Sequence, residues 1–178
     1  RKLGFEMASD YQTGSLLRTL AATKPAGRIL ELGTGTGLSA AWMLDGMDAS
    51  SRLTSVDTDK DAVSVARNAL DHDPRVTFII QDGSEFLRSL TGKTFDLIFA
   101  DTWPGKIWDL DLALNLLAPG GMYVVDDMSH QAHWPNDHLP KIDRLIENLE
   151  NRDDFFQTKL AWSTGIMIIT KKPHQADS

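Results

Sequence analysis

A glycine-rich stretch decides the fold, and it reads Ile29-Leu30-Glu31-Leu32-Gly33-Thr34-Gly35-Thr36-Gly37. An apolar run with strand character, Arg28–Leu32, leads into three alternate glycines, and helical spacing follows over Leu38–Leu44. Glycine at such a junction permits positive φ and lets a ligand lie against bare backbone at a helix N-terminus. A tight turn without a ligand is the alternative interpretation. Three alternate glycines at one junction favour the ligand.

The same alternation of strand and helix continues outward from this junction. Further predicted strands are Leu53–Val56, Val76–Ile80, Phe95–Ala100 and Met122–Val125. Helical spacing is found over Gly14–Ala22, Ala62–Ala69, Ser84–Leu90 and Leu110–Leu117. Because the strands are apolar almost throughout and helices separate them, we expect a parallel sheet that is covered on both faces.

The last third of the chain changes character. A helix is predicted over Pro140–Leu149, followed by two strand-like runs, Phe155–Ala161 and Gly165–Thr170. The three residues between these runs are too few for a parallel crossover, so the runs should pair as an antiparallel hairpin. The sequence therefore predicts a Rossmann-like, doubly wound α/β fold. Its seven-stranded sheet would be mostly parallel, and residues 1–178 would form a single domain.

Composition narrows the class of protein. The 178 residues carry a net charge of −7 and no cysteine, which excludes disulfides, thiolate metal sites and cysteine nucleophiles. An acidic chain argues against a nucleic-acid partner, which normally meets a basic surface. The sequence lacks an apolar run of the roughly 20 residues that cross a bilayer, and residues 1–10 lack the apolar core of a signal peptide. We expect a cytoplasmic protein without a membrane partner.

The spacing of the glycines and the nearby charges narrow the classes of ligand that the glycine stretch could bind. Neither Gly33 nor Gly35 starts the G-x-G-x-x-G order of dinucleotide sites, and no Lys-Ser/Thr pair follows Gly37 as in a P-loop. Acidic residues stand at or just after the ends of five predicted strands: Glu31, Asp57, Asp82, Asp101 and Asp126. In an open α/β sheet these ends face one crevice. Such a ring repels pyrophosphate and attracts a cation, which predicts a positively charged nucleoside without phosphate.

These motifs resemble the class I S-adenosylmethionine-dependent methyltransferases over nearly the whole chain. The similar stretches are Glu31–Gly37, Ser55–Asp59, Gln81–Ser84, Phe95–Asp101 and Leu117–Gly121, the last standing before the predicted fifth strand. Within the class, the Gly-Thr-Gly-Thr-Gly form and the stretch Ala100–Trp103 are most similar to catechol- and caffeoyl-CoA-type O-methyltransferases. The resemblance implies S-adenosylmethionine as cofactor and a hydroxyl as methyl acceptor.

The expected roles of the cofactor-binding residues follow from their positions at the ends of the predicted strands. Asp57 is expected to accept the ribose hydroxyls, with a helix N-cap as the alternative. Glu31 is expected to neutralise the amino group of the methionine moiety, with a salt bridge to Arg28 as the alternative. Asp82 and Gly83 are expected to meet the adenine amino group, and an N-cap competes there too. The resemblance also implies cofactor contacts from Gly33, Thr34, Gly35, Gly37, Ser39, Thr58 and Asp101.

The acceptor side is predicted from the loops after the fourth and fifth strands. These loops hold Trp103, Lys106, Trp108, His130, His133, Trp134 and His138. Aromatic walls suit a flat acceptor, although the same residues could simply anchor the loops. The loop histidines lack the spacing of a helical metal pair, so solvated side chains are expected. Asp101 or Lys106 is the expected catalytic residue that assists loss of the acceptor proton.

A divalent cation is a further implication of the resemblance. The similar O-methyltransferases hold Mg²⁺ or a related ion through an Asp after strand four and an Asp-Asn pair after strand five. Here Asp101 matches the first ligand, whereas Asp126 is followed by Asp127 in place of Asn. Oxygen ligands of this kind suit Mg²⁺. Asp127 departs from the family pattern, and so does Lys106, which Pro104-Gly105 displaces from the position where the family keeps a lysine. The sequence therefore leaves open whether a metal ion binds.

Other functions remain open from the sequence. A polyamine aminopropyltransferase would use the same fold and a sulfonium nucleoside. A nucleic-acid methyltransferase would show a basic face and paired prolines after strand four, which Asp101-Thr102-Trp103-Pro104 lacks. A binding protein without catalysis would keep the nucleoside site alone. We expect a small, aromatic acceptor, and a homodimer is one arrangement that the sequence leaves open.

Overall fold

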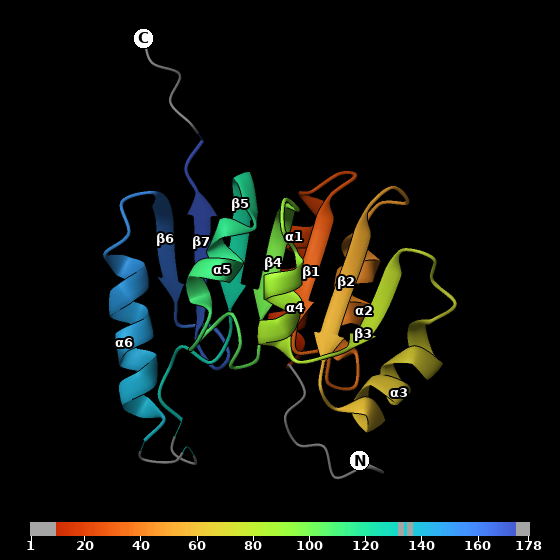
Figure 1. The fold of residues 1–178 in the computed structure, drawn as a ribbon, viewed down its shortest axis with the longest axis horizontal. Helices are drawn as coiled ribbons and strands as arrows, with labels where there is room; N and C mark the ends of the chain where they lie inside the picture. Colours follow the sequence, from red (N-terminus) through yellow and green to blue (C-terminus); the bar gives the residue numbers. More distant parts are fainter. Residues whose placement is uncertain (1–9, 132–133, 135–136, 174–178) are drawn as a thin grey trace.

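Seven strands form one sheet in the order β3-β2-β1-β4-β5-β7-β6 in the computed structural model, which describes residues 10–131, 134 and 137–173 (Figure 1). The strands are β1 (Arg28–Leu32), β2 (Arg52–Asp57), β3 (Val76–Ile80), β4 (Phe95–Ala100), β5 (Leu117–Val125), β6 (Phe155–Leu160) and β7 (Ile166–Lys171). β1 to β5 pair in parallel, whereas β7 is antiparallel to both β5 and β6. The predicted sheet and its C-terminal hairpin are confirmed.

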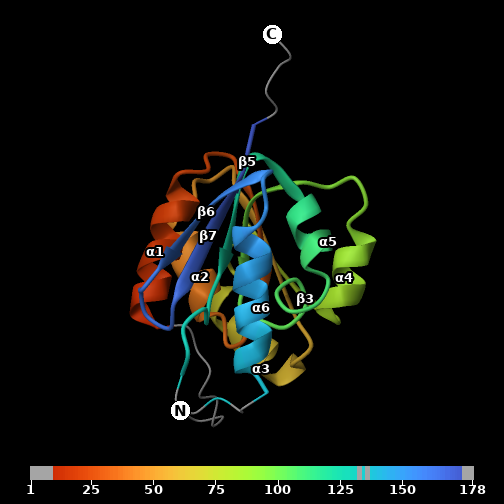
Figure 2. The ribbon, with the colours of Figure 1, turned by 90° about the vertical axis from the view of Figure 1, so that its left-hand side faces the viewer.

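Helices cover both faces of this sheet. They are α1 (Tyr11–Ala22), α2 (Leu38–Gly46), α3 (Lys60–Leu70), α4 (Gly83–Ser89), α5 (Leu110–Asn115) and α6 (Leu139–Glu150). α1, α2 and α3 pack into one buried cluster, and α4, α5 and α6 pack into another. Figure 2 shows α1 and α2 on one side of the sheet and α4 and α5 on the other. Burial of apolar side chains on both faces explains why the strands read as apolar runs.

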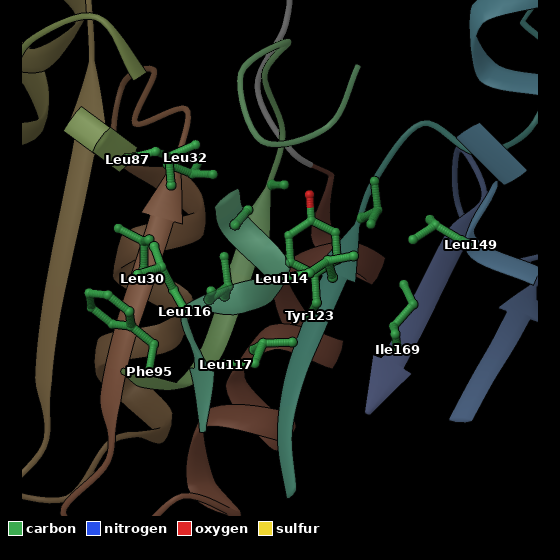
Figure 3. Close-up of a cluster of buried hydrophobic side chains, with 14 of the residues drawn as sticks. Leu30, Leu32, Leu87, Phe95, Leu114, Leu116, Leu117, Tyr123, Leu149 and Ile169 are labelled. Carbon is green, nitrogen blue, oxygen red and sulfur yellow. The ribbon is translucent and has the colours of Figure 1, made fainter. Parts of the chain in front are cut away.

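The core below α4, α5 and α6 reaches the carboxyl ends of the parallel strands. Leu32 at the end of β1 and Leu87 of α4 lie together at one end of this cluster, and Tyr123 of β5 stands among leucines (Figure 3). The side chains of Leu32 and Tyr123 are fully buried. A close-packed core of this kind gives the strand ends a fixed position, from which the loops of the site extend.

One prediction about the fifth strand was wrong. The helix expected over residues 110–117 ends at Asn115, and β5 begins at Leu117 instead of after the Pro-Gly-Gly turn. Phe95 pairs with Leu117, and the register then shifts before Leu97 pairs with Met122. Gly120 has a φ of +74°, so it accommodates the irregular backbone that this shift requires. The turn is therefore a bulge within the strand.

The helices of the described residues include none that is both long and apolar enough to cross a membrane.

Candidate active site

The glycine stretch forms a left-handed turn between β1 and α2. Gly33, Gly35 and Gly37 have φ values of +104°, +50° and +86°, which side-chain-bearing residues rarely adopt. The Gly33 N–H donates to the Val56 carbonyl at 2.9 Å, so the turn is fastened to the neighbouring strand β2. Gly37 is the N-cap of α2. The junction predicted from the sequence is confirmed: Gly33 and Gly35 are partly exposed, and Gly37 is buried against Ala66 of α3.

Asp57 closes β2 directly beside this turn. Its Oδ2 accepts the Gly35 N–H at 2.9 Å, and its Oδ1 accepts the Asp59 N–H at 2.9 Å. The N-cap alternative for Asp57 was wrong, because Asp59 caps α3 by accepting from Asp61 and Ala62. A carboxylate oxygen has two lone pairs, so each Asp57 oxygen retains one for a further donor such as a ribose hydroxyl.

Glu31 lies beneath the turn. Its side chain is fully buried and accepts hydrogen bonds from the hydroxyls of Ser39 and Ser55. Thr34 adds to this group, since its hydroxyl lies 2.6 Å from that of Ser55. Burial raises the pKa of Glu31 to about 7, although the two serine hydrogen bonds act to lower it. The carboxyl is held by α2 and β2 at once.

The alternative of a salt bridge between Glu31 and Arg28 was wrong. The Arg28 N–H donates to Asp96, and its guanidinium lies over the ring of Phe95. Neither contact involves Glu31. The predicted role of Glu31 opposite an amino group is untested, and the structure adds Ser39 and Ser55 as the residues that hold its carboxyl in place.

The end of β3 presents an exposed acid and a buried glycine. Asp82 caps α4 by accepting the Glu85 N–H at 3.0 Å, which confirms the N-cap alternative for this residue. The cap uses Oδ1, so the predicted adenine contact stays a prediction. Gly83 is buried, and a Cβ there would come within 2.9 Å of Pro104. The glycine therefore brings the β3 end against the loop after β4. Thr58, also predicted to bind cofactor, is exposed.

Charged side chains gather at the ends of β4 and β5. Asp101 and Asp126 are largely buried, and burial raises the pKa of each carboxyl. The charges of Asp126 and Asp127 raise that of Asp101 further. The side chain of Lys106 is only 6% exposed, and its Nζ lies 3.9 Å from Asp127 Oδ2. The two predicted catalytic residues therefore belong to one electrostatic group, since the Lys106 charge lowers the pKa of Asp101.

These acids do not fit a metal site. Among residues 10–131, 134 and 137–173, no three metal-ligating side chains are grouped closely enough to hold an ion. Asp126 Oδ1 already accepts from Thr164 Oγ1 at 2.6 Å and from the Asp127 N–H at 2.8 Å. A buried ammonium stands beside Asp127 in addition. The predicted convergence of Asp101, Asp126 and Asp127 on one ion is not found, because hydrogen bonds and Lys106 already compensate them.

The tryptophans predicted to flank the acceptor contact one another. Trp103 stacks on Trp108 with ring centroids 5.1 Å apart, and His138 meets the edges of Trp103 and Trp134. Lys141 Nζ lies 4.8 Å from the centre of the Trp103 ring. Burial lowers the pKa of His138. This aromatic cluster connects the loop after β4 to the start of α6, which supports the loop-anchoring interpretation.

His130 belongs to a separate ion pair on the surface. His130 is exposed and pairs with Asp143 on α6 at 3.1 Å, so the predicted solvated side chain is confirmed for this residue. His133 lies outside the described residues.

Three residues that shape the site after β4 and β5 were not predicted from the sequence: Tyr123, Gly105 and Thr164. The fully buried Tyr123 donates through its hydroxyl to the Gly105 carbonyl, and thereby fixes the loop that carries Lys106. Gly105 has a φ of +80°, and a Cβ there would come within 2.4 Å of Leu32. Thr164, before β7, holds Asp126. The signals in the sequence were a tyrosine inside an apolar strand and a Pro-Gly pair directly before the lysine.

Known proteins share both the sequence pattern and the fold. A family model described as a methyltransferase domain matches residues 30–128. A Mycolicibacterium vanbaalenii protein named "Putative O-methyltransferase" is 32% identical over 117 residues, which are 63% of this chain and 52% of that protein. The chain thus spans about half the length of the curated relatives it matches.

Solved structures agree with this match. A crystal structure from Klebsiella pneumoniae, titled as that of a "putative O-methyltransferase", is 25% identical with a TM-score of 0.81, over 94% of this chain and 83% of that one. The O-methyltransferase TomG from Streptomyces achromogenes, in complex with S-adenosylmethionine, shares the fold at 23% identity and a TM-score of 0.80, over 94% and 82%. The family model covers more than half of the sequence, and the chain therefore belongs to the methyltransferase domain family.

Proposed function

We propose that this chain transfers a methyl group from S-adenosylmethionine to a hydroxyl of a small, aromatic acceptor. One observation carries the proposal: the left-handed glycine turn after β1 and the Asp57 carboxylate after β2 meet at one edge of the sheet. Bare backbone and an acid with spare lone pairs suit a nucleoside that carries positive charge and no phosphate. A phosphate would be repelled by Asp57.

S-adenosylmethionine supplies, when bound, a methyl group already activated by the sulfonium charge. The protein has to bind and align the two reactants, and alignment of this kind is worth about 7–11 kcal/mol. The glycine turn admits the nucleoside, Asp57 accepts from its ribose, and Asp82 with Gly83 borders the adenine. Glu31 compensates positive charge from beneath the turn, where Ser39 and Ser55 hold it.

On the acceptor side, Asp101 accepts the proton that the hydroxyl must lose. Its burial and its acidic neighbours give the carboxyl a raised pKa, which favours proton acceptance. Lys106 supplies an ammonium in the same group and stabilises the negative charge that develops on the acceptor oxygen. No step is assigned to a metal ion, because the acids do not form an ion-binding group. The nearby tryptophans favour a flat acceptor.

Calorimetric titration with S-adenosylmethionine tests the nucleoside site. Asp57→Ala should weaken binding about tenfold or more, because each lost charge-assisted hydrogen bond is worth about 1.5–3 kcal/mol. Asp59→Ala is the matched control. It removes the cap of α3 and should cost stability while leaving the affinity for S-adenosylmethionine nearly unchanged. An unchanged dissociation constant in Asp57→Ala would refute the ribose assignment.

A methyl-transfer assay tests the reaction. Phenols and catechols should be methylated, and a single-stranded RNA should not be. Turnover of RNA at a rate that no phenol matches would contradict the proposed acceptor class. Binding of S-adenosylmethionine without turnover of any phenol would contradict the proposed reaction but not the proposed nucleoside site.

A further inference from the structure

A cavity of about 510 Å³ lies between α5 and α6, on the face of the sheet opposite α1 and α2. Figure 2 shows these two helices side by side on that layer. The cavity is bordered by the loop after β4, the start of α5 and one face of α6. Its charged lining residues are Lys106, Asp109, Asp111, Lys141, Arg144 and Arg152.

Cations dominate this lining although the chain as a whole carries a net charge of −7. Both acids of the lining are already paired, Asp111 with Arg152 and Asp109 with Arg88 of α4. Within the described part of the chain, no hydrogen bond or ion pair is formed by the Arg144 side chain. Three of the four cations are paired in turn: Lys106 with Asp127, Lys141 with Asp137, and Arg152 with Asp111. The exposed guanidinium of Arg144 therefore stands out as the cation that the lining offers to a ligand.

The cavity meets the group of charges described above at one residue, Lys106. Lys106 lines its wall and at the same time stands 3.9 Å from Asp127. Leu110 and Leu145 contribute apolar surface beside the cations. A volume of this size suits a small molecule, since binding cavities measure roughly 300–1,000 Å³. Apolar surface together with a free guanidinium suits an organic anion better than an inorganic ion.

We propose that this cavity binds the anionic group of the methyl acceptor, a carboxylate or a phosphate ester. The inference rests on the proposed function and names the substrate class more narrowly: an aromatic hydroxyl compound that also carries negative charge. Arg144 is the anchoring residue, because a guanidinium forms paired hydrogen bonds with either group. The acceptor hydroxyl then lies on the side of Lys106 and Asp101.

Steady-state kinetics with a charged and a neutral acceptor test whether the cavity binds an anionic group. Protocatechuate, which is catechol with an added ring carboxylate, should show a KM about tenfold lower than neutral catechol does. In Arg144→Gln the ratio between the two KM values should fall to near one. Lys159→Gln removes an exposed charge on β6, outside the cavity lining, and should leave the ratio unchanged. Equal KM values in the wild type, or the same change in both variants, would overturn the proposal.

Direct binding separates this proposal from the proposed function. Benzoate, phenyl phosphate and neutral benzamide are titrated into the protein, and chemical-shift changes report binding. Benzoate or phenyl phosphate should bind more tightly than benzamide and lose this preference in Arg144→Gln; the tighter of the two anions identifies carboxylate or phosphate. This outcome upholds the anion site even if no phenol is methylated. Benzamide binding as tightly as both anions would overturn the site even if methyl transfer is observed.

Discussion

The two halves of the crevice edge are built in different ways. On the proposed donor side, after β1 and β2, hydrogen bonds tie Thr34 and Gly35 of the turn to Ser55 and Asp57 of β2. On the acceptor side, after β4 and β5, buried charges face one another, and Lys106 compensates the acids. The donor side is thus held by backbone geometry, and the acceptor side by charge balance. The positive φ of the turn can be predicted from a local pattern of glycines, whereas a balance of charges depends on which side chains pack together.

The largest effect is expected from a change in the donor-side turn. Gly33→Ala should lower the free energy of unfolding by about 3 kcal/mol, because the residue has a positive φ and its Cβ would meet the Asp101 carbonyl at 2.9 Å. This corresponds to a fall of roughly 10 °C in Tm for a chain of this size. S-adenosylmethionine affinity should fall as well. Thermal melting and calorimetry measure both.

A second glycine supplies the control. Gly92 also has a positive φ, of +73°, but an added Cβ there would meet nothing within 4 Å. Gly92→Ala should therefore cost only about 1 kcal/mol, from backbone strain alone. Equal destabilisation in the two variants would mean that the turn is not held tightly against the β4 end.

The glycine turn and the position of Asp57 beside it could be predicted from the sequence, because a few neighbouring residues specify them. The cap that Asp82 forms on α4 was only the alternative to its expected adenine contact. The position of Lys106 could not be predicted, because it depends on the Gly105 turn and on Tyr123, 18 positions along the chain. The early start of β5 was missed because a bulge breaks the strand pattern.

A buried carboxyl on the donor side should make stability depend on pH. The pKa of Glu31 is raised to about 7 from 4.5, so the folded state holds a proton that the unfolded state has lost between these pH values. Stability should therefore fall as pH rises from 4.5 to 7, by on the order of 2–3 kcal/mol, and stay low above that. Glu31→Gln should reduce the slope by this amount and match the wild type at the acid end, and the slope that remains belongs to the other carboxyls with a raised pKa, Asp101 and Asp126.

Urea denaturation between pH 4.5 and pH 8 measures the effect. Glu150→Gln, an exposed change at the end of α6, is the matched control and should retain the wild-type slope. If Glu31→Gln keeps the full wild-type slope, the Glu31 carboxyl does not release its proton in this pH range, and its raised pKa is refuted.

A smaller effect is expected from the aromatic cluster. Trp108 is half exposed and stacks on Trp103, so Trp108→Ala should cost about 1 kcal/mol and lower Tm by a few degrees. S-adenosylmethionine affinity should not change, because the donor side does not contact this ring in the described residues. Trp162→Ala, at a similarly exposed tryptophan near α1, controls for loss of surface area. A large rise in acceptor KM without any loss of Tm would show that Trp108 binds acceptor rather than anchoring the loop.

The smallest effect on turnover is expected from a chelator, which tests whether Lys106 or a metal ion neutralises the acids after β4 and β5. Lys106 stands where a cation would otherwise neutralise Asp101, Asp126 and Asp127. Excess EDTA should therefore leave methyl transfer unchanged, and titration of Mg²⁺ into the wild type should release no measurable heat. Lys106→Met removes the ammonium that faces these acids, so this variant should bind Mg²⁺ more tightly than the wild type does. Loss of wild-type turnover in EDTA with recovery in Mg²⁺ would show that an ion displaces Lys106 from the acids, and that the acceptor side is held by a metal after all.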